Sequence, residues 1–205
     1  MKIKLGRALM ALGAACFLAG VGLLLFNAAQ AKKAEQAVME VIPELVEEIT
    51  QKREEAEKEA LLPELVLDPA NVEMTEVTIK GHSYIGYLTI DDLVLPILSD
   101  WSYKKLQIAP CRYTGNLRSN DLVLMAHNYP KHFGKLSDLR WGDSVTFTDM
   151  DGVLTKYTVV SRDILDPSAV EEMTAGNFDL TLFTCTYGGK SRVTVYCDRV
   201  EYTAE

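Results

Sequence analysis

A cysteine, an arginine and a histidine each lie at the edge of a short apolar run in this chain. Cys185 ends the run Thr181–Thr184, Arg192 follows it at a distance of seven residues, and His127 closes the earlier run Leu122–Ala126. A thiolate is a strong nucleophile that a nearby cation favours, and an imidazole can carry protons during acyl transfer. A guanidinium keeps its charge and can stabilise an oxyanion. The three residue types therefore predict acyl transfer by a cysteine nucleophile.

Cys185 has a structural alternative, since free cysteine is among the most buried residue types. The Thr186–Gly189 segment after it is typical of a loop, which favours an accessible thiol at a strand end. In the strand predicted to begin at Arg192, alternation places Cys197 on the opposite face, in apolar packing. Cys111 follows a proline in a polar stretch, and the spacing leaves a Cys111–Cys197 disulfide open.

The remaining polar residues give weaker signals. His132 is predicted to lie in a loop and His82 in a turn, as ordinary surface or hydrogen-bonded residues. Asp149 and Asp151 are interpreted as turn residues rather than as a calcium site, and no spacing typical of a zinc site is present. No histidine follows Cys185, which disfavours the order of papain-like hydrolases. A caspase-like order is compatible, but its Gln-Ala-Cys context is absent.

The composition and the N-terminal sequence restrict the possible functions and the cellular location further. The formal net charge of -8 over 205 residues argues against a nucleic-acid partner, which would need a basic surface. Ala8–Ala31 is nearly uncharged and long enough to cross a bilayer, and Lys2, Lys4 and Arg7 precede it. The basic flank predicts a cytoplasmic N-terminus with the rest of the chain outside.

A cleaved signal peptide is the alternative, because Ala29-Gln30-Ala31 resembles a cleavage site. The apolar core from Ala8 to Phe26 is longer than the usual signal-peptide core of about 7–15 residues, so we favour a retained anchor.

The chain is predicted to have three parts: an anchor at residues 1–31, a helical stalk and linker at 32–70, and a domain at 71–205. An apolar stripe from Val38 to Ile49 has helical spacing, and Pro43 inside it predicts a kink or the start of a second helix. We expect a stalk that holds the domain off the membrane. The alternative is a regulatory helix that packs on the domain or self-associates.

The domain consists of short runs rich in β-branched residues, separated by turn residues. Such runs predict an all-β barrel or sandwich. The predicted strands are Glu76–Ile79, Tyr84–Ile90, Leu93–Leu98, Leu122–Ala126, Ser144–Thr148, Leu154–Val160, Leu180–Thr184 and Arg192–Arg199. Short helices are predicted at Tyr103–Leu106, Phe133–Leu139 and Pro167–Glu172.

The motifs of this domain resemble those of sortases, the membrane-anchored cysteine transpeptidases of Gram-positive bacteria. The similarity covers about Val77 to Val200. Besides Thr181–Cys185, it rests on Tyr84–Ile90, Leu95-Pro96-Ile97, Asn120–Asn128, His132–Leu136 and Trp141–Val145.

The resemblance implies a closed eight-stranded β-barrel with a type II membrane anchor and no metal or organic cofactor. It implies that Cys185 is the nucleophile, His127 the general acid and base, and Arg192 the residue that positions substrate and stabilises the oxyanion. Thr184 resembles a position that assists the oxyanion hole and contacts the sorting motif. The implied partners are surface proteins with a C-terminal LPxTG-like sorting signal and an amine acceptor on a peptidoglycan precursor or a pilin.

The resemblance leaves alternatives for the sortase class and for the activity. The segment Arg162–Phe178 is shorter than the class B insertion, and class C enzymes often carry a C-terminal membrane segment beyond a point such as Glu205, so a class A-, D- or E-like enzyme is favoured. Asp68-Pro69 lacks the aromatic residue of an Asp-Pro-Trp lid motif. The alternatives are a pilin-polymerising or hydrolytic relative, or a non-catalytic membrane-tethered binding module.

Overall fold

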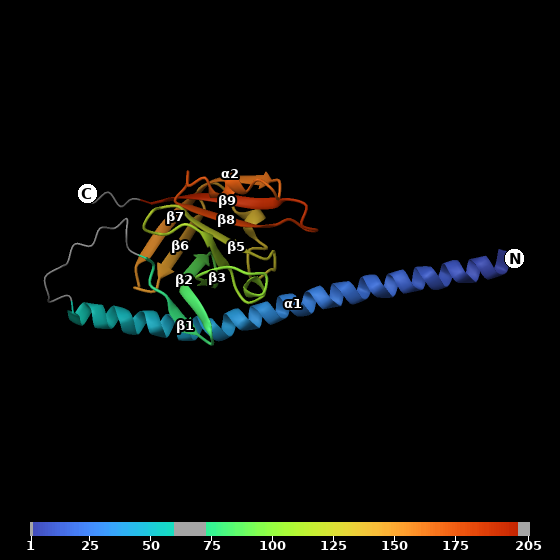
Figure 1. Cartoon of the computed structure of the whole chain (residues 1–205), viewed down its shortest axis with the longest axis horizontal. Helices are drawn as coiled ribbons and strands as arrows, with labels where there is room; N and C mark the ends of the chain where they lie inside the picture. Colours follow the sequence, from blue (N-terminus) through green and yellow to red (C-terminus); the bar gives the residue numbers. More distant parts are fainter. Residues whose placement is uncertain (1, 60–72, 201–205) are drawn as a thin grey trace.

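The computed structural model describes residues 2–59 and 73–200 and shows a long helix beside a β-barrel (Figure 1). Helix α1 spans Lys2–Glu59, so one helix crosses the predicted boundary at residue 31. Pro43 lies inside α1 at an exposed position, and no second helix starts there. The predicted linker residues Pro63 and Pro69, together with Asp68, lie outside the described residues.

Nine strands follow α1 in the described part of the chain, and eight of them close a barrel. They are β1 (Val77–Ile79), β2 (His82–Ile90), β3 (Leu93–Leu98), β4 (Cys111–Thr114), β5 (Leu122–Ala126), β6 (Ser144–Asp149), β7 (Leu154–Leu165), β8 (Leu180–Cys185) and β9 (Arg192–Arg199). The sheet order is β1-β2-β3-β4-β5-β8-β9-β7-β6, and an additional pairing between β2 and β6 closes the ring. Strand β1 pairs with β2 alone and lies outside the ring. The predicted closed eight-stranded barrel is confirmed.

The sequence patterns miss one strand and shorten another. Cys111, which the sequence places in a polar stretch, starts β4, is fully buried and pairs with Leu98 and Met125. A four-residue strand is too short to show alternation. Strand β7 continues past the predicted end at Val160 to Leu165, and its outer half pairs with β9. The three predicted short helices are replaced by shorter turns of helix: η2 (Lys105–Gln107), η3 (Leu136–Asp138) and α2 (Val170–Thr174).

Closure of the barrel requires a glycine in β2. Gly86 has a φ of 140°, and a Cβ atom there would lie 2.1 Å from the carbonyl oxygen of Thr148 on β6. The register of the β2–β3 pair shifts at the same point, between Tyr84 and Gly86. Only glycine tolerates both this backbone conformation and this close approach.

The apolar stripe of α1 packs against the barrel. Val38, Val41, Leu45 and Ile49 recur every three or four residues, are buried, and belong to the same core cluster as the barrel interior. Fully burying an aliphatic side chain contributes about 1.5–3 kcal/mol. This part of α1 therefore packs on the domain, which was the alternative to the predicted stalk.

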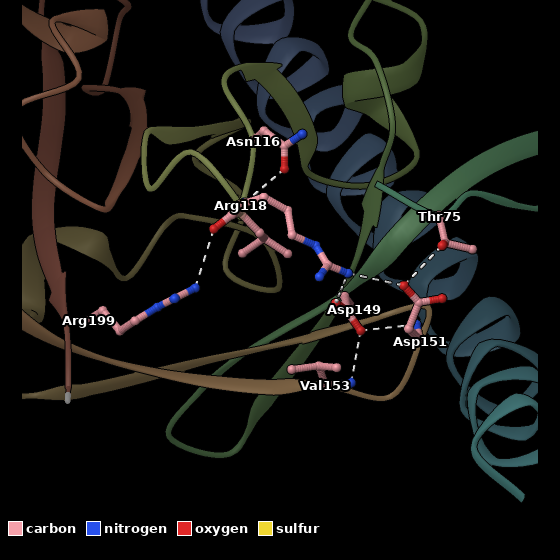
Figure 2. A network of polar contacts seen from close by, with 8 residues as sticks. Thr75, Asn116, Arg118, Asp149, Asp151, Val153 and Arg199 are labelled. Atoms are coloured by element: carbon pink, nitrogen blue, oxygen red, sulfur yellow. Dashed lines mark hydrogen bonds and ion pairs between the residues drawn. The ribbon is translucent and has the colours of Figure 1, made fainter. Parts of the chain in front are cut away.

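A polar network at one end of the barrel holds three connections together (Figure 2). Arg118, between β4 and β5, lies 3.4 Å from Asp151 and 4.0 Å from Asp149 at the β6–β7 turn. The Thr75 hydroxyl, ahead of β1, donates to Asp151 at 3.0 Å. Asp149 accepts backbone N–H groups from Asp151 at 3.0 Å and from Val153 at 2.8 Å. Asp151 is a turn residue, as predicted, whereas Asp149 is the last residue of β6. We call the group Arg118, Asp149 and Asp151 the Arg118 network.

Candidate active site

The three residues predicted to do chemistry lie at neighbouring strand ends. Strands β5 and β8 are parallel neighbours with Ala126 paired to Thr184, so His127 and Cys185 are the next residues along two adjacent strands. Strand β9 runs antiparallel to β8, and its first residue, Arg192, is the direct partner of Cys185. Directly opposed residues in an antiparallel pair project to the same face. The topology therefore brings all three groups to one rim of the barrel.

The site lies on the outer wall of the barrel. Leu180 and Leu182 of β8 point into the main core, whereas Phe183 belongs to a separate cluster with Val123 and Met173. Met173 comes from α2, which covers this wall from outside. Because side chains alternate along a strand, Cys185 shares the outer face with Phe183.

A hollow of about 190 Å³ surrounds these groups. We call it the Cys185 hollow. It is lined by Trp101, Tyr103, Leu106, Tyr113, Met125, Ala126, His127, Pro167, Val170, Met173, Phe183, Thr184, Cys185 and Arg192. The hollow thus combines one thiol, one imidazole and one guanidinium with a largely apolar wall.

Aromatic rings form one side of the hollow. Trp101 stacks on Tyr113 with ring centroids 5.6 Å apart, and Tyr113 meets the edge of Phe183 at 5.3 Å. Sequence reasoning missed this wall. Tyr113 lies on the unpredicted strand β4, and Trp101 and Tyr103 precede η2 in a stretch without alternation. The signal that could have found it is a pair of aromatic residues two positions apart in a turn-rich segment.

Cys185 is the accessible thiol of the barrel. It is partly exposed, whereas Cys111 and Cys197 are fully buried. Burial raises the pKa of Cys111 and of Cys197 to about 12 each, which keeps both as neutral thiols. All of the cysteines are free, so Cys111 and Cys197 form no disulfide. The predicted orientation of Cys197, in apolar packing away from Arg192, is confirmed.

His127 is half-buried, and its ring lies against Tyr129 with centroids 4.9 Å apart. Burial lowers the pKa of His127 below its ordinary value, because desolvation disfavours the imidazolium. Its side chain forms no hydrogen bond or ion pair with any residue that the structure describes. The loop after it is tight, since the Phe133 N–H donates to the His127 carbonyl at 3.1 Å and a Cβ at Gly134 would lie 2.6 Å from the Tyr129 carbonyl oxygen.

The other two histidines lie outside the hollow. His132 is 1% exposed rather than a surface loop residue, and both of its ring nitrogens are buried without a hydrogen bond. Burial lowers the pKa of His132 to about 4, with a smaller contribution from the charge of His127, and the Ile108 backbone opposes both effects. His82 starts β2. Of the three histidines, only His127 therefore lines the hollow that contains Cys185.

Arg192 presents its charge without a carboxylate partner. Its Nη1 donates to the carbonyl oxygens of Ser191 at 3.2 Å and Gly189 at 3.3 Å, and it forms no ion pair with a described residue. Arg192 does act at longer range on Asp166, whose pKa is lowered mainly by hydrogen bonds from Ser168 and to a lesser degree by the charge of Arg192. The guanidinium fork is therefore available for an anionic or carbonyl ligand.

Thr184 ties together the two strand ends that carry His127 and Cys185. Its hydroxyl donates to the Ala126 carbonyl at 2.8 Å, and the side chain is buried. The hydroxyl proton is thus already committed inside the protein, and its use on an oxyanion would require this bond to break. The predicted contact of Thr184 with a sorting motif stays a prediction.

A family profile described as a sortase domain matches residues 88–200, more than half of the chain. The chain belongs to the sortase family. This sortase is accordingly a cysteine transpeptidase, and its exposed N-terminal apolar helix is long enough to anchor it in a membrane. Among the described residues, no three His, Cys, Asp or Glu side chains come together as a metal site would require.

Solved structures agree with the family. Sortase C of Streptococcus pneumoniae is 25% identical with a TM-score of 0.55, covering 81% of this sortase and 99% of that chain. Sortase C1 of Streptococcus suis is 27% identical with a TM-score of 0.50, covering 59% and 75%. Sortase A of Corynebacterium diphtheriae shares the fold at 18% identity and a TM-score of 0.54, covering 86% and 94%. No curated protein matches this sortase.

These structures do not confirm the predicted class A-, D- or E-like subclass, because sortases named C and A both resemble the chain.

Proposed function

We propose that this sortase cleaves a C-terminal sorting signal through a thioester on Cys185 and passes the acyl group to an amine. The observation that supports this most directly is the Cys185 hollow, where the one accessible thiol of the barrel lies beside His127 and Arg192. The other barrel thiols are buried and neutral. A nucleophile, a proton carrier and a fixed cation are the groups that acyl transfer needs.

The reaction has two steps. The Cys185 thiolate attacks a peptide carbonyl, a C–S bond forms, and the C–N bond breaks as protonated His127 gives its proton to the leaving amine. The acceptor amine then attacks the thioester, His127 takes the proton of that amine, and the thiolate leaves. The lowered pKa of His127 makes its imidazolium a stronger acid toward the leaving amine, but it also reduces the protonated fraction at neutral pH.

Arg192 is proposed to hold the substrate carbonyl and the oxyanion. Its guanidinium has no carboxylate to satisfy it, so a developing negative charge on the substrate oxygen would be its first anionic partner. The aromatic side of the hollow, with Trp101 and Tyr113, suits the apolar side chains of an LPxTG-like signal.

The acceptor has two candidates. An amine of a cell-wall precursor is the first, and the amine of a pilin subunit is the second. The pilin candidate is favoured by likeness to two structures named sortase C, one of which is described in terms of pilin substrate specificity. The same likeness supports a class C-like enzyme over a class A-, D- or E-like one.

The proposed arrangement in the cell follows from the sequence. Lys2, Lys4 and Arg7 precede the apolar part of α1, which favours a cytoplasmic N-terminus and an extracellular barrel. We retain the division into an anchor at 1–31, a helical segment and linker at 32–70 and a barrel domain at 71–205 as a proposal. Surface proteins with a sorting signal would be the acyl donors.

Mass spectrometry tests the proposal. Incubation of the full chain in detergent with an LPxTG-like peptide is expected to add the mass of the cleaved acyl fragment, on the peptide that contains Cys185. The control is Cys185→Ala, which keeps Cys111 and Cys197 and should remain unmodified. Addition of a lysine-bearing pilin-like peptide or a peptidoglycan-stem amine then shows which acceptor releases the acyl group. A reduced Cys185 that forms no adduct and cleaves none of a panel of LPxTG-like peptides would refute the proposal for these substrates.

A further inference from the structure

Two loops beside the Cys185 hollow face α1 where its apolar run ends. One loop follows His127, and the other is the β8–β9 connection that follows Cys185. They border a groove of about 410 Å³ that is lined by Leu24, Asn27, Ala28, Ala31, Asn128, Tyr129, Pro130, Tyr187 and Gly188. In Figure 1 the β8–β9 connection projects from the barrel on the side of the N-terminal half of α1.

The depth of this groove relative to a bilayer follows from α1. The apolar run Ala8–Phe26 spans about 28 Å at about 1.5 Å per residue, close to the hydrocarbon thickness of a bilayer, about 30 Å. Leu24 therefore marks the edge of the hydrocarbon layer, and Asn27 to Ala31 lie at the level of the lipid headgroups. The described side chains of α1 are exposed up to Ala29, Gln30 and Ala31 are partly covered, and Ala34 is the first buried residue of the helix. The barrel thus begins where the bilayer would end.

The residues at this level are those that suit a membrane interface. Tyr187 is 93% exposed and is followed by Gly188 and Gly189, both with positive φ. Exposed lysines lie on the two loops, Lys190 and Lys131, and on α1, Lys32 and Lys33. A single exposed aromatic residue needs no explanation. Tyrosine and lysine together at headgroup depth match the interfacial preference of tyrosine and the attraction of lysine to lipid phosphates.

We propose that the two loops, 128–131 and 186–190, form a membrane-facing surface that seats in the headgroup layer of the bilayer. The Tyr187 ring lies at the interface, and the lysines of this surface face the phosphates of anionic phospholipid. Tyr187 is two residues from Cys185, and an extended chain spans at most about 3.6 Å per residue. The nucleophile is therefore held about 7 Å or less, along the backbone, from a residue in contact with lipid. Membrane contact would fix the height of the hollow above the bilayer.

Photochemical crosslinking tests this surface without relying on enzyme activity. The full chain is inserted into vesicles of phosphatidylglycerol and phosphatidylethanolamine, with the photoreactive amino acid p-benzoylphenylalanine in place of Tyr187. Illumination is expected to give a phospholipid adduct on the peptide that carries position 187. The same replacement at Leu24, at the hydrocarbon edge, is expected to label with lipid as well.

The matched negative control is Leu154, which is 52% exposed and starts β7 at the far end of the barrel. A Cβ at the nearby Gly152 would lie 3.4 Å from Arg53, about 38 Å further along α1 than Ala28. Replacement of Leu154 is expected to give no lipid adduct. Crosslinks from position 187 to α1 alone would overturn the proposal, as would equal lipid labelling at 154 and 187. Absence of lipid labelling at both 24 and 187 would overturn it too, because the inferred depth rests on Leu24.

Discussion

The Cys185 hollow and the Arg118 network lie at opposite ends of β5 and β7 and use charged groups in opposite ways. In the Arg118 network, Asp149 accepts two backbone N–H groups, and Arg118 approaches two carboxylates. In the hollow, Arg192 bonds only to backbone carbonyls, and the His127 side chain has no hydrogen-bond partner among the described residues. Buried and half-buried polar groups are normally satisfied. At the hollow, the groups left open lie where a ligand can complete the bonding, whereas the satisfied charged groups of the Arg118 network hold the fold.

The largest expected effect separates two cysteines. Cys185→Ala is expected to abolish turnover of a sorting peptide, because the proposed thioester then has no sulfur atom to form on. Cys197→Ala removes a fully buried thiol from the core and is expected to lower stability by about 1–2 kcal/mol while turnover remains. Peptide cleavage followed by chromatography, with urea unfolding in parallel, measures both. Residual turnover in Cys185→Ala would assign the nucleophile elsewhere.

The second effect separates two histidines. His127→Ala is expected to reduce kcat/KM by about 10²- to 10⁴-fold, the usual contribution of a general acid and base. His132→Ala is expected to be mild for turnover, because His132 is buried outside the hollow. Its effect should appear in stability instead, through the space left in the core. Equal losses of turnover in the two variants would mean that the wrong histidine has been assigned.

The third effect separates two arginines. Arg192→Lys keeps the positive charge but loses the planar fork, and a loss of about 10²-fold in kcat is expected if the fork holds the oxyanion. Arg118→Lys should leave kcat unchanged and cost at most about 1 kcal/mol, because that side chain is partly exposed and solvent weakens its ion pairs. Steady-state kinetics on both variants checks this. Unchanged kcat in Arg192→Lys would refute the assigned role.

The sequence predicted the residues at the rim of the site but not the aromatic residues of its wall. The positions of three residues were predictable, because each ends or begins a strand with a clear apolar pattern: His127, Cys185 and Arg192. Pairing of the neighbouring strands then brings the three residues to one rim of the barrel. Tyr113 and Trp101 were not predictable. Their positions depend on β4, which is only four residues long and is held by pairing with β3 and β5 rather than by its own pattern.

The fold shows the same division. The barrel strands follow from alternation, whereas the packing of α1 on the barrel was only the alternative to the predicted stalk. Its stripe from Val38 to Ile49 has helical spacing, but spacing alone does not say which surface will cover it. The burial of His132 was missed for a related reason, because a loop residue is buried or exposed according to contacts that are distant in sequence.

The fourth effect concerns the pH dependence of stability. The pKa of His132 falls from 6.5 in the unfolded chain to about 4 in the fold, so the neutral form is favoured by folding. The part of the folding stability that depends on neutral His132 is fully present above pH 6.5. It falls by about 3 kcal/mol as the pH decreases toward 4. His132→Leu, which has no nitrogen to protonate, is expected to lose less stability over this window. Urea unfolding of both proteins in detergent across the window measures the difference, and identical pH profiles would contradict the assignment.

The smallest effect compares two buried threonines at the two ends of the barrel. Thr184→Val removes the hydroxyl that donates to the Ala126 carbonyl and is expected to cost about 1–3 kcal/mol. Turnover should also fall, since the ends of β5 and β8 that carry His127 and Cys185 lose their tie, and Thr184→Ser should restore both. Thr148 is also buried, near the Arg118 network, but its hydroxyl has no hydrogen-bond partner.

Thr148→Val is therefore expected to be neutral or stabilising, because a methyl group replaces a buried hydroxyl that forms no bond. Thermal unfolding of the three variants beside the wild type gives the comparison. Equal destabilisation by Thr184→Val and Thr148→Val would show that burial of the hydroxyl, and not its bond across β5 and β8, sets the cost. A loss of turnover in Thr184→Val without loss of stability would instead assign the hydroxyl a direct contact with substrate.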